Sequence, residues 1–593
     1  MQYLGLEIDL SRDGLFDELG LIRMKESYMK EDETSPQHRF AFVSKTFGSN
    51  DAHAQRLYDY ASQHWLSYAT PVLSFGRSKR GLPISCFLNF IEDTAEGLVE
   101  NLSETNWLSM LGGGVGIGFG IRSADDKSTG VMPHLKMYDA GSLAYRQGRT
   151  RRGSYAAYLD ISHPDILMFL EMRKPTGDQN LRTLNLNHGI NISDEFMELI
   201  ERCMKDGDAN DDWELKNPAN GETVEVVSAK ALWQKILDLR MQTGEPYLIF
   251  IDTANRALPS WLDDKGLQIN GSNLCTEIFL PTSKDRTAVC CLSSVNLEYY
   301  DDWKDNKQFI PDIMEMLDNV IDYFITNAPD HIRRAITSAT AERSVGLGSL
   351  GFHAYLQKNN IPIDGVMSKL TNKDIFSHIN KECLRADSIL FRKRGACPDA
   401  AWSGVDRRFS HHMAIAPNAS SSLIMGNTSP SIEPYRANVF RQDTLSGAFV
   451  YRNRFLSKRL ADLGMDDDDT WASIIANDGS VQHLDVPEDV KEVFKTAMEI
   501  DQRWLVELAA DRQQFIDQGQ SVNLFFRPDT TIAYLHAVHF MAWKMGLKSL
   551  YYLRSDKVRK ADKVGAQIQR QRIEETIDMT AIANGETCLA CEG

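Results

Sequence analysis

The sequence has no apolar run that could cross a membrane, because no stretch approaches the roughly 18 consecutive apolar residues that a transmembrane helix needs. Residues 1–12 contain acidic side chains and no apolar core, so they do not have the pattern of a secretory signal. Both absences predict a cytoplasmic protein that makes no contact with a membrane.

Positive charge is also scarce. The 593 residues include 65 Lys and Arg against 82 Asp and Glu, a formal net charge of −17. Nucleic acids and anionic membranes require a basic surface, so this balance excludes both as partners. The apolar share of 42% is ordinary for a globular protein, and the length allows several domains or one large barrel with appendages.

The chain lacks the paired cysteines of a structural zinc site. Its nine cysteines are spread over the whole length, and an odd number does not suit a disulfide framework. Only Cys588 and Cys591 have the C-x-x-C spacing, and no second pair accompanies them. We therefore expect no metal site and interpret this pair as a redox dithiol.

What the sequence does contain is a polar triad, Asn273, Cys275 and Glu277, followed by the apolar residues 278–280. In an extended backbone, residues two apart point the same way. The triad would then present an amide, a thiol and a carboxylate on one face, which suit an orienting group, a reactive sulfur and a general base. The alternative is a buried strand with an inert thiol, the commoner fate of a lone cysteine.

The pattern along the chain predicts an α/β fold. Helical spacing covers residues 35–65, where Ser35 and Pro36 suit the helix start. Beyond residue 70, short apolar segments alternate with amphipathic ones, which indicates buried strands between helices. The strand-like segments include 247–251, 277–280 and 549–553, and the helical ones include 313–325 and 490–508.

After Arg554 the sequence becomes charged and polar, and it lacks the apolar mass that would offset the entropy of ordering. We interpret this part as a flexible tail that carries the dithiol, with a functionless terminus as the alternative. The expected organisation is a short helical region at 1–66, a catalytic domain at 67–556 and the tail at 557–593.

Three segments could contact phosphate, and each has a simpler reading. The glycine run 112–120 allows close backbone approach, but it fits no common nucleotide-loop template, and tight packing explains it as well. Residues 417–422 offer free N–H groups at a helix start, or ordinary capping. The loop 146–153 holds four arginines, which suit phosphate or a solvated surface.

Taken together, the motifs resemble one family, the large catalytic subunit of class I ribonucleotide reductases. The resemblance runs in order from Thr70 to the C-terminus. Its carriers are the motifs 83–87 around Cys86, 244–247, 273–277, 288–293 around Cys290, 346–352, 395–398 and 417–421, the pair Tyr551 and Tyr552, and the dithiol Cys588 and Cys591.

The resemblance implies a ten-stranded α/β barrel with Cys275 on a finger loop in its centre. Cys275 would become a transient thiyl radical that abstracts the 3′-hydrogen of a ribonucleoside diphosphate. Glu277 would take the 3′-OH proton, and Asn273 would hold the sugar hydroxyls. Cys86 would protonate the departing 2′-OH and then form a disulfide with Cys290, which supplies the two electrons.

By the same resemblance, Tyr551 and Tyr552 would relay the radical from a small subunit that holds iron, manganese or both, and no cofactor would be bound covalently to this chain. Cys588 and Cys591 would re-reduce the internal disulfide and pass the oxidation to thioredoxin or glutaredoxin. Cys291 departs from many relatives, which have a non-thiol there, so either sulfur of the vicinal pair could face Cys86, although the spacing favours Cys290.

Nucleotide sites are implied as well. The substrate-contacting positions are Thr70, Ser85, Gly114, Asn273, Glu277, Pro417, Asn418, Ala419, Ser420 and Ser421. The effector positions are Asp93, Arg122, Gln147 and Arg151, for dNTP or ATP with Mg²⁺, and the resemblance implies a homodimer, at least with effector bound. Only 69 residues precede Thr70, which suggests a short form without the N-terminal ATP-cone of many relatives and therefore without dATP shut-off.

Two rival functions remain. An adenosylcobalamin-dependent class II reductase would share the barrel and the cysteines, but it would not need the tyrosine pair followed by a dithiol. A catalytically inactive nucleotide-binding regulator would not need the intact triad and five matched cysteines.

Overall fold

The computed structural model describes residues 1–77, 81–145, 154–444 and 447–555. No helix in these ranges combines the length and apolarity needed to cross a bilayer.

The N-terminal part is helical, but the helix expected over 35–65 is divided in two. Ser35 caps α2 (Pro36–Phe47) by accepting a hydrogen bond from the Gln37 N–H, as the Ser-Pro pattern predicted. The chain then breaks at Gly48, and Asn50 caps a new helix, α3 (Asp51–Ser62), through the His53 N–H. A second N-cap so soon after Gly48 is the signal that helical periodicity alone does not show. The helix α1 (Glu18–Ser27) precedes this pair, and α4 (Thr70–Leu73) follows it.

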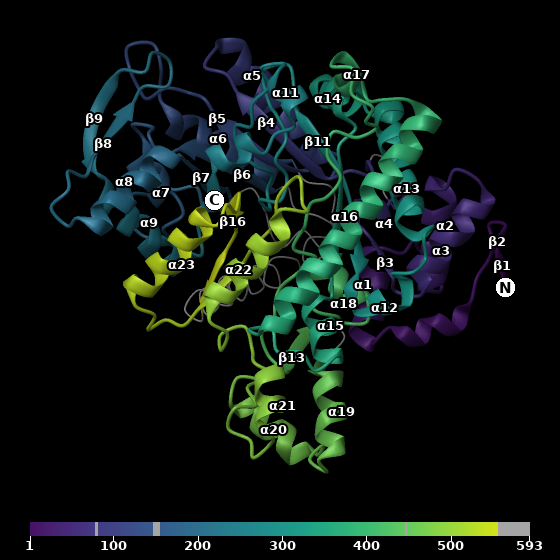
Figure 1. The fold of residues 1–593 in the computed structure, drawn as a ribbon. Coiled ribbons are helices and arrows are strands. Elements are labelled where there is room, and N and C mark those ends of the chain that lie inside the picture. The colour runs from purple at the N-terminus through teal and green to yellow at the C-terminus, as the bar shows by residue number, and fades with distance from the viewer. Residues whose placement is uncertain (78–80, 146–153, 445–446, 556–593) are drawn as a thin grey trace, which may run out of the picture.

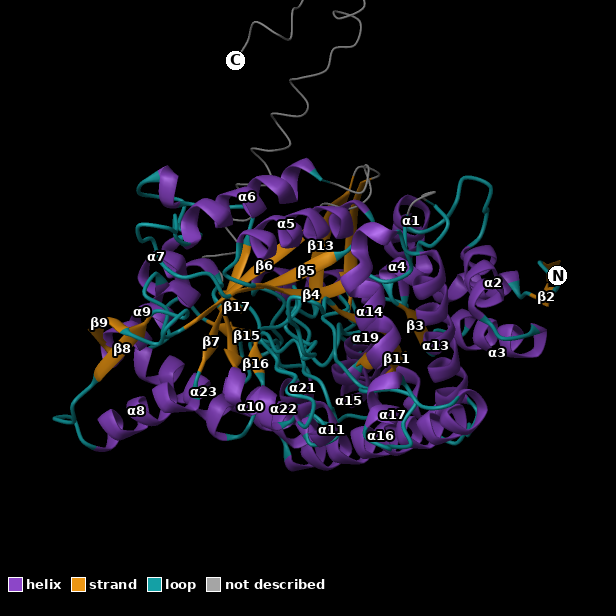
Figure 2. Ribbon diagram, turned by 90° about the horizontal axis from the view of Figure 1, so that it is seen from above, coloured by secondary structure: helices purple, strands orange, loops and turns teal. Residues whose placement is uncertain are grey.

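One curled sheet occupies the centre of the molecule, with helices around it (Figure 2). Its hydrogen-bonded order is β12 (Val345–Leu350), β11 (Ala288–Asn296), β4 (Cys86–Ile91), β5 (Gly114–Phe119), β6 (Ser154–Asp160), β7 (Asn187–Ile192), β10 (Tyr247–Phe250) and β16 (Ser549–Leu550), and β3 (Leu66–Tyr68) pairs with β11. The five strands from β4 to β10 are parallel, and β11 runs antiparallel to β4. The α/β prediction is therefore confirmed.

Helices connect successive strands and cover the outer face of the sheet. Those between the first five strands are α5 (Ala95–Met110), α6 (Val131–Ala144), α7 (Ile166–Glu171), α8 (Asp194–Lys205) and α9 (Ala229–Thr243). Later ones are α10 (Ile251–Arg256), α11 (Ser260–Asp263), α12 (Tyr300–Trp303), α13 (Phe309–Asn327), α14 (Arg333–Glu342), α15 (Phe352–Lys358), α16 (Val366–Arg394), α17 (Pro398–Trp402), α18 (Ala419–Ile424), α22 (Gln502–Gln513) and α23 (Ile532–Lys544). The helix expected over 313–325 lies within α13, whereas 490–508 is split between α21 (Glu488–Val493) and α22.

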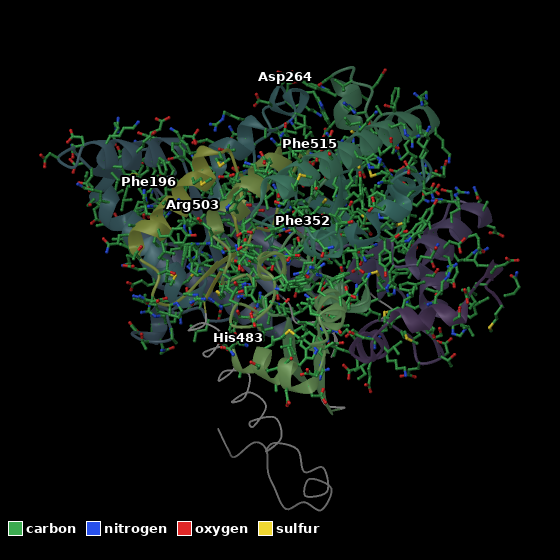
Figure 3. All side chains as sticks on the ribbon, turned by 60° about the horizontal axis from the view of Figure 1, so that its bottom comes forward. Phe196, Asp264, Phe352, His483, Arg503 and Phe515 are labelled. Carbon is green, nitrogen blue, oxygen red and sulfur yellow. The ribbon has the colours of Figure 1, made fainter. Side chains whose placement is uncertain are left out.

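Two structures project from this body. The hairpin of β8 (Asp212–Lys216) and β9 (Thr223–Ser228) lies beside α8 (Figure 1). The second is a lobe with its own apolar core, built from β13 (Val439–Thr444), β14 (Gly447–Arg452), α19 (Arg454–Asp462), α20 (Asp468–Ala476) and α21 (Glu488–Val493). In Figure 3, His483 marks this lobe, whereas Phe352 lies within the densely packed body. The small pairs β1 (Gln2–Tyr3) with β2 (Leu6–Glu7), and β15 (Leu524–Phe526) with β17 (Leu553–Ser555), complete the strands of the described residues.

The glycine run 112–120 forms strand β5 and lies against the loop that contains the polar triad. A Cβ on Gly116 would come within 1.8 Å of the Ser272 carbonyl oxygen, and a Cβ on Gly118 within 2.9 Å of that of Asn270. These alternate positions share one face of the strand, so glycine lets the loop backbone lie directly on the sheet. Tight packing, rather than a nucleotide loop, accounts for the run.

Gly116→Ala tests this packing. The overlap is with backbone, which cannot move aside as a flexible side chain does, so we expect the loop to be displaced. Overpacking costs about 1–3 kcal/mol, so hydrogen–deuterium exchange at the Glu277 and Ile278 amides should accelerate by about ten- to hundredfold. Gly207→Ala is the matched control, because a Cβ there meets nothing within 4 Å. Equal exchange in both variants would contradict the packing argument.

Candidate active site

The polar triad lies on a buried turn, not on the extended strand that the sequence suggested. Thr276 has a left-handed φ of 66°, and the Asn273 side-chain oxygen accepts hydrogen bonds from the N–H groups of Glu277 and Ile278, both at 3.1 Å. The predicted strand over 277–280 is wrong for the same reason, because this segment is irregular. The turn, rather than strand alternation, brings Asn273 and Glu277 together.

Glu277 is a buried carboxylate with few charge partners. The Ser521 hydroxyl donates to its Oε2 at 3.2 Å and to the Cys275 carbonyl oxygen at 2.5 Å. Burial raises the pKa of Glu277 to about 7, although hydrogen bonds from Asn273 and Ser521 oppose the shift. A carboxyl group that titrates near neutral pH is suited to accept a proton as a general base.

Cys275 adjoins a cluster of tyrosines. Its side chain packs against the apolar cluster that contains Tyr551. Desolvation raises the pKa of the buried Tyr551 phenol, and the neighbouring Cys275 adds to this shift. The ring centroids of Tyr551 and Tyr552 are 4.3 Å apart, and Tyr247 lies 4.8 Å from Tyr551 and 5.0 Å from Tyr552. A continuous path of phenol rings therefore ends at the Cys275 sulfur.

The register of the sheet brings Cys86 and Cys290 face to face. They are directly opposite residues of the antiparallel pair β4 and β11, a position in which Cα atoms lie about 4.5–5.5 Å apart and which meets the requirement of a disulfide. Both side chains belong to one apolar cluster, while Cys291 belongs to the main core behind the strand. Of the vicinal pair, it is Cys290 that faces Cys86.

The other predicted substrate positions lie where strands and helices begin: Ser85 directly precedes β4, and Gly114 is the first residue of β5. The Gly114 N–H donates to the Ser85 carbonyl at 2.7 Å. Asn418 has a left-handed φ of 52° at the start of α18, and its amide donates to the Ser349 carbonyl at 3.0 Å, so it holds the turn that opens the helix. Pro417 precedes it, and Ala419, Ser420 and Ser421 form the first turn of α18, so a helix starts here as predicted, although Asn418 makes no side-chain capping hydrogen bond.

Two polar side chains near these positions, those of Arg23 and Tyr28, were not predicted from the sequence. Arg23 on α1 donates to the Ser420 hydroxyl at 3.4 Å, and the Tyr28 hydroxyl lies 3.4 Å from that of Thr70. Both lie in the N-terminal part of the chain, and Arg23 is several hundred residues from Ser420 in the sequence. No local pattern links such distant residues; a lone arginine on an exposed helix has the sequence signature of a surface residue.

The predicted effector residues meet at one edge of the sheet. Asp93 follows β4 and Arg122 follows β5, and parallel neighbours end at the same edge. The Arg122 guanidinium contacts the Asp93 carboxylate at 2.5 Å and that of Asp125 at 2.8 Å. The other predicted effector residues, Gln147 and Arg151, lie outside the described residues, as do Cys588, Cys591 and the tail expected over 557–593.

Within the ranges that the structure describes, no three His, Cys, Asp or Glu side chains are grouped so as to hold a metal ion.

Comparison with known proteins agrees with this geometry. A family model described as "Ribonucleotide reductase, barrel domain" matches residues 84–406 and 403–553, and one described as "Ribonucleotide reductase, all-alpha domain" matches residues 14–81. The class of protein that the fold and the site define is thus that of the ribonucleotide reductases.

The relatives are large subunits. The chain is 50% identical to the ribonucleoside-diphosphate reductase large subunit of Invertebrate iridescent virus 3, covering 94% of this chain and 97% of the relative. It is 46% identical to the putative large subunit of Frog virus 3, with 93% and 94% covered. The solved class Id alpha subunit of Actinobacillus ureae superposes with a TM-score of 0.80 at 35% identity, over 93% of this chain and 98% of that one. The chain belongs to the family of ribonucleotide reductase large subunits.

The raised pKa of Glu277 predicts a pH-dependent effect on stability. Its folded-state value of about 7 exceeds the ordinary 4.5, so its contribution to stability is full below pH 4.5 and is lost as the pH rises through 7. Glu277→Gln has no carboxyl group to titrate there and does not undergo this loss. We therefore expect the difference in melting temperature, variant minus unsubstituted chain, to become more positive as the pH rises from 5 to 8.

Glu225→Gln, at an exposed carboxylate on β9, controls for the removal of one charge. A Glu277→Gln difference that stays constant with pH, like that of the control, would show that the carboxyl group titrates at its ordinary pKa.

Proposed function

We propose that this chain reduces ribonucleoside diphosphates to 2′-deoxyribonucleoside diphosphates through a thiyl radical on Cys275, and so supplies precursors for DNA synthesis. The observation that carries the proposal is the position of Cys275, on the buried turn, against the apolar cluster that contains Tyr551. This position links the oxidisable sulfur of Cys275 to the path of phenol rings, and the Glu277 carboxyl group is held on the same turn as the sulfur.

In the first steps, Cys275 abstracts the 3′-hydrogen of the ribose and Glu277 takes the proton of the 3′-hydroxyl. The raised pKa of Glu277 supports this role, because a base that titrates near pH 7 can both accept the proton and return it. Asn273 holds the sugar hydroxyls, and its contacts with the Glu277 and Ile278 amides keep the base in place.

The electrons come from Cys86 and Cys290. Cys86 protonates the 2′-hydroxyl, which leaves as water, and the two sulfurs then join. The substrate gains two electrons and the thiol pair loses two, while Cys275 returns the abstracted hydrogen to the 3′ position and is again a thiyl radical. The directly opposed register of Cys86 and Cys290 supports this pairing, and Cys291 faces the core instead.

The partners follow from this chemistry. A small subunit generates the radical at an iron or manganese centre, and Tyr552 and Tyr551 pass it to Cys275. Cys588 and Cys591 carry reducing equivalents from thioredoxin or glutaredoxin to the internal disulfide. The large-subunit relatives support a small-subunit partner.

The substrate diphosphate binds at the start of α18, where Pro417 to Ser421 offer backbone N–H groups and hydroxyls. Arg23 beside Ser420 supports an anion there. Thr70, Ser85 and Gly114 complete the sugar and phosphate contacts. The effector, a dNTP or ATP with Mg²⁺, binds near Asp93 and Arg122 together with Gln147 and Arg151 and shifts substrate preference.

We also propose that two chains associate through α5 and α6. These helices lie side by side (Figure 2), and they expose Val99 by 70% and Met137 by 48%. Exposed apolar side chains on two adjacent helices give a second copy of the chain apolar surface to bury. The effector residues follow the strands that flank α5, so effector binding and pairing of the chains would be coupled.

The sheet itself is proposed to close into a barrel of ten strands. The isolated bridges Leu347 to Met413 and Ile415 to Gln520 continue the order beyond β12, and the Tyr551 N–H donates to the Val522 carbonyl next to β16. With residues 413–415 and 520–522 counted as short strands, the ring would be complete. The domain limits of 1–66, 67–556 and 557–593 are proposed with it, the helical region continuing to Leu73 in the structure.

Reconstitution with the small subunit encoded in the same genome tests the function. With dithiothreitol present, we expect CDP to become dCDP in many turnovers, and Cys275→Ser to abolish product because a hydroxyl does not form an accessible radical. Cys203→Ser, at a buried cysteine on α8, is the matched control. Turnover by Cys275→Ser would contradict the radical assignment, and turnover that needs adenosylcobalamin instead of the small subunit would favour the class II alternative.

A further inference from the structure

Gln518 is a buried amide, wholly shielded from solvent, that contacts the sulfur of Cys290. Its Nε2 lies 3.3 Å from the Cys290 Sγ, 3.1 Å from the Val345 carbonyl oxygen and 3.4 Å from the Ser344 hydroxyl. The Ser344 hydroxyl also approaches the sulfur, at 3.8 Å. Two donors therefore converge on one thiol.

The orientation of this amide is fixed by its neighbours. The Gln518 Oε1 accepts from the Phe279 N–H at 3.3 Å, while Nε2 donates to the Val345 carbonyl. Exchanging the two ends would set N–H against N–H and oxygen against oxygen. The N–H that Val345 does not use consequently points toward the Cys290 sulfur and the adjacent Ser344 hydroxyl.

The backbone on both sides of Gln518 is held as well. The Asp517 carboxylate accepts from the N–H groups of His412 and Met413, at 2.8 and 2.9 Å. The Gly519 N–H donates to the Glu277 carbonyl at 2.8 Å. The amide is thus positioned between the turn that bears Glu277 and the sulfur of Cys290.

The two sulfurs of the proposed redox pair differ in access. Cys290 is 1% exposed, whereas Cys86 is half-buried. A Cβ on Gly346 would come within 3.1 Å of the Cys290 Sγ, so the sulfur is packed against strand β12. An incoming thiolate can reach Cys86 more readily, and the sulfur that departs is then Cys290.

We propose that Gln518, assisted by Ser344, is a positioning residue that stabilises the negative charge on Cys290 as the disulfide with Cys86 opens, and so makes Cys290 the leaving sulfur in re-reduction. The inference rests on the proposed function of the Cys86 and Cys290 pair. Hydrogen bonds to a charged atom are stronger than those to a neutral one, so the amide acts mainly on the charged transition state.

A thiolate of the reductant attacks the Cys86 sulfur and forms a mixed disulfide, the bond between Cys86 and Cys290 breaks, and Cys290 leaves as a thiolate that takes up a proton. The second thiol of the reductant then displaces Cys86. The reductant loses two electrons and the protein gains two. Burial raises the pKa of Cys290 to about 12, and the bonds from Gln518 and Ser344 oppose that rise.

The test uses the full chain with Cys588→Ser and Cys591→Ser, oxidised at the internal pair and reduced by dithiothreitol. Adding Gln518→Met keeps a chain of similar size without the donor. We expect the reduction rate to fall by about tenfold or more, as for loss of a hydrogen bond to a charged group. The equilibrium ratio of disulfide to dithiol should stay within about twofold, because neutral thiol and disulfide gain little from the amide.

Gln502→Met is the matched control. Gln502 is equally buried, accepts a hydrogen bond from the Phe525 N–H and donates to the Ala497 and Ile500 carbonyls, but no sulfur is among its partners. Its rate and equilibrium should both match those of the parent chain. A change of rate and equilibrium together in Gln518→Met would show a merely structural role, and an unchanged rate would overturn the proposal.

Two further measurements keep the proposal falsifiable. If Gln518→Met fails to fold, Ser344→Ala removes the second donor, and an unchanged rate in that variant would overturn the proposal. With 2-mercaptoethanol, the mixed disulfide should be found on Cys86, and its appearance on Cys290 would refute the leaving-group assignment. No ribonucleotide is present in these assays. A negative result in them therefore refutes the role of Gln518 but not CDP reduction, whereas absence of CDP reduction would refute the proposed function itself.

Discussion

The structure depends on burying a polar turn inside a sheet. Residues 272–278 carry backbone groups that must be hydrogen-bonded once water is excluded, and the surrounding elements supply the partners. Tyr158 donates to the Asn273 carbonyl, Ser549 to that of Thr276, and Gly519 to that of Glu277. Because every contact comes from a different element, the turn has one position, and the sulfur of Cys275 is fixed with it.

This constraint explains how distant parts of the chain serve one reaction. The segment 517–521 follows α22, yet it contacts the turn through Ser521, and the thiol of Cys290 through Gln518. The glycines of β5 admit the turn from the other side. A reactive centre held by packed backbone loses little entropy when substrate binds, and this favours reactions that need exact orientation of several groups.

The sequence could predict the α/β class, the helix starts at Ser35 and Ala419, and the residues of the triad, because each depends on local spacing or on a recognisable motif. It could not predict the turn: alternation of Asn273, Cys275 and Glu277 suits a strand, and only Thr276 in a left-handed conformation shows otherwise. Gln518 and Ser521 were missed because polar residues in short segments normally lie on the surface, and their burial is a property of the assembled fold. Arg23, partly exposed on α1, was missed because no local pattern links it to Ser420.

Cys86 and Cys290 face each other across β4 and β11, with Cys291 turned into the core, and this pairing decides which sulfurs supply the electrons. Peptide mapping after a single turnover, in the absence of reductant, tests it most directly, with Cys290→Ser and Cys291→Ser compared. The account predicts that Cys291→Ser still forms one disulfide, between Cys86 and Cys290, and that Cys290→Ser forms none. A link between Cys86 and Cys291 in Cys290→Ser, or the absence of a link between Cys86 and Cys290 in Cys291→Ser, would contradict it.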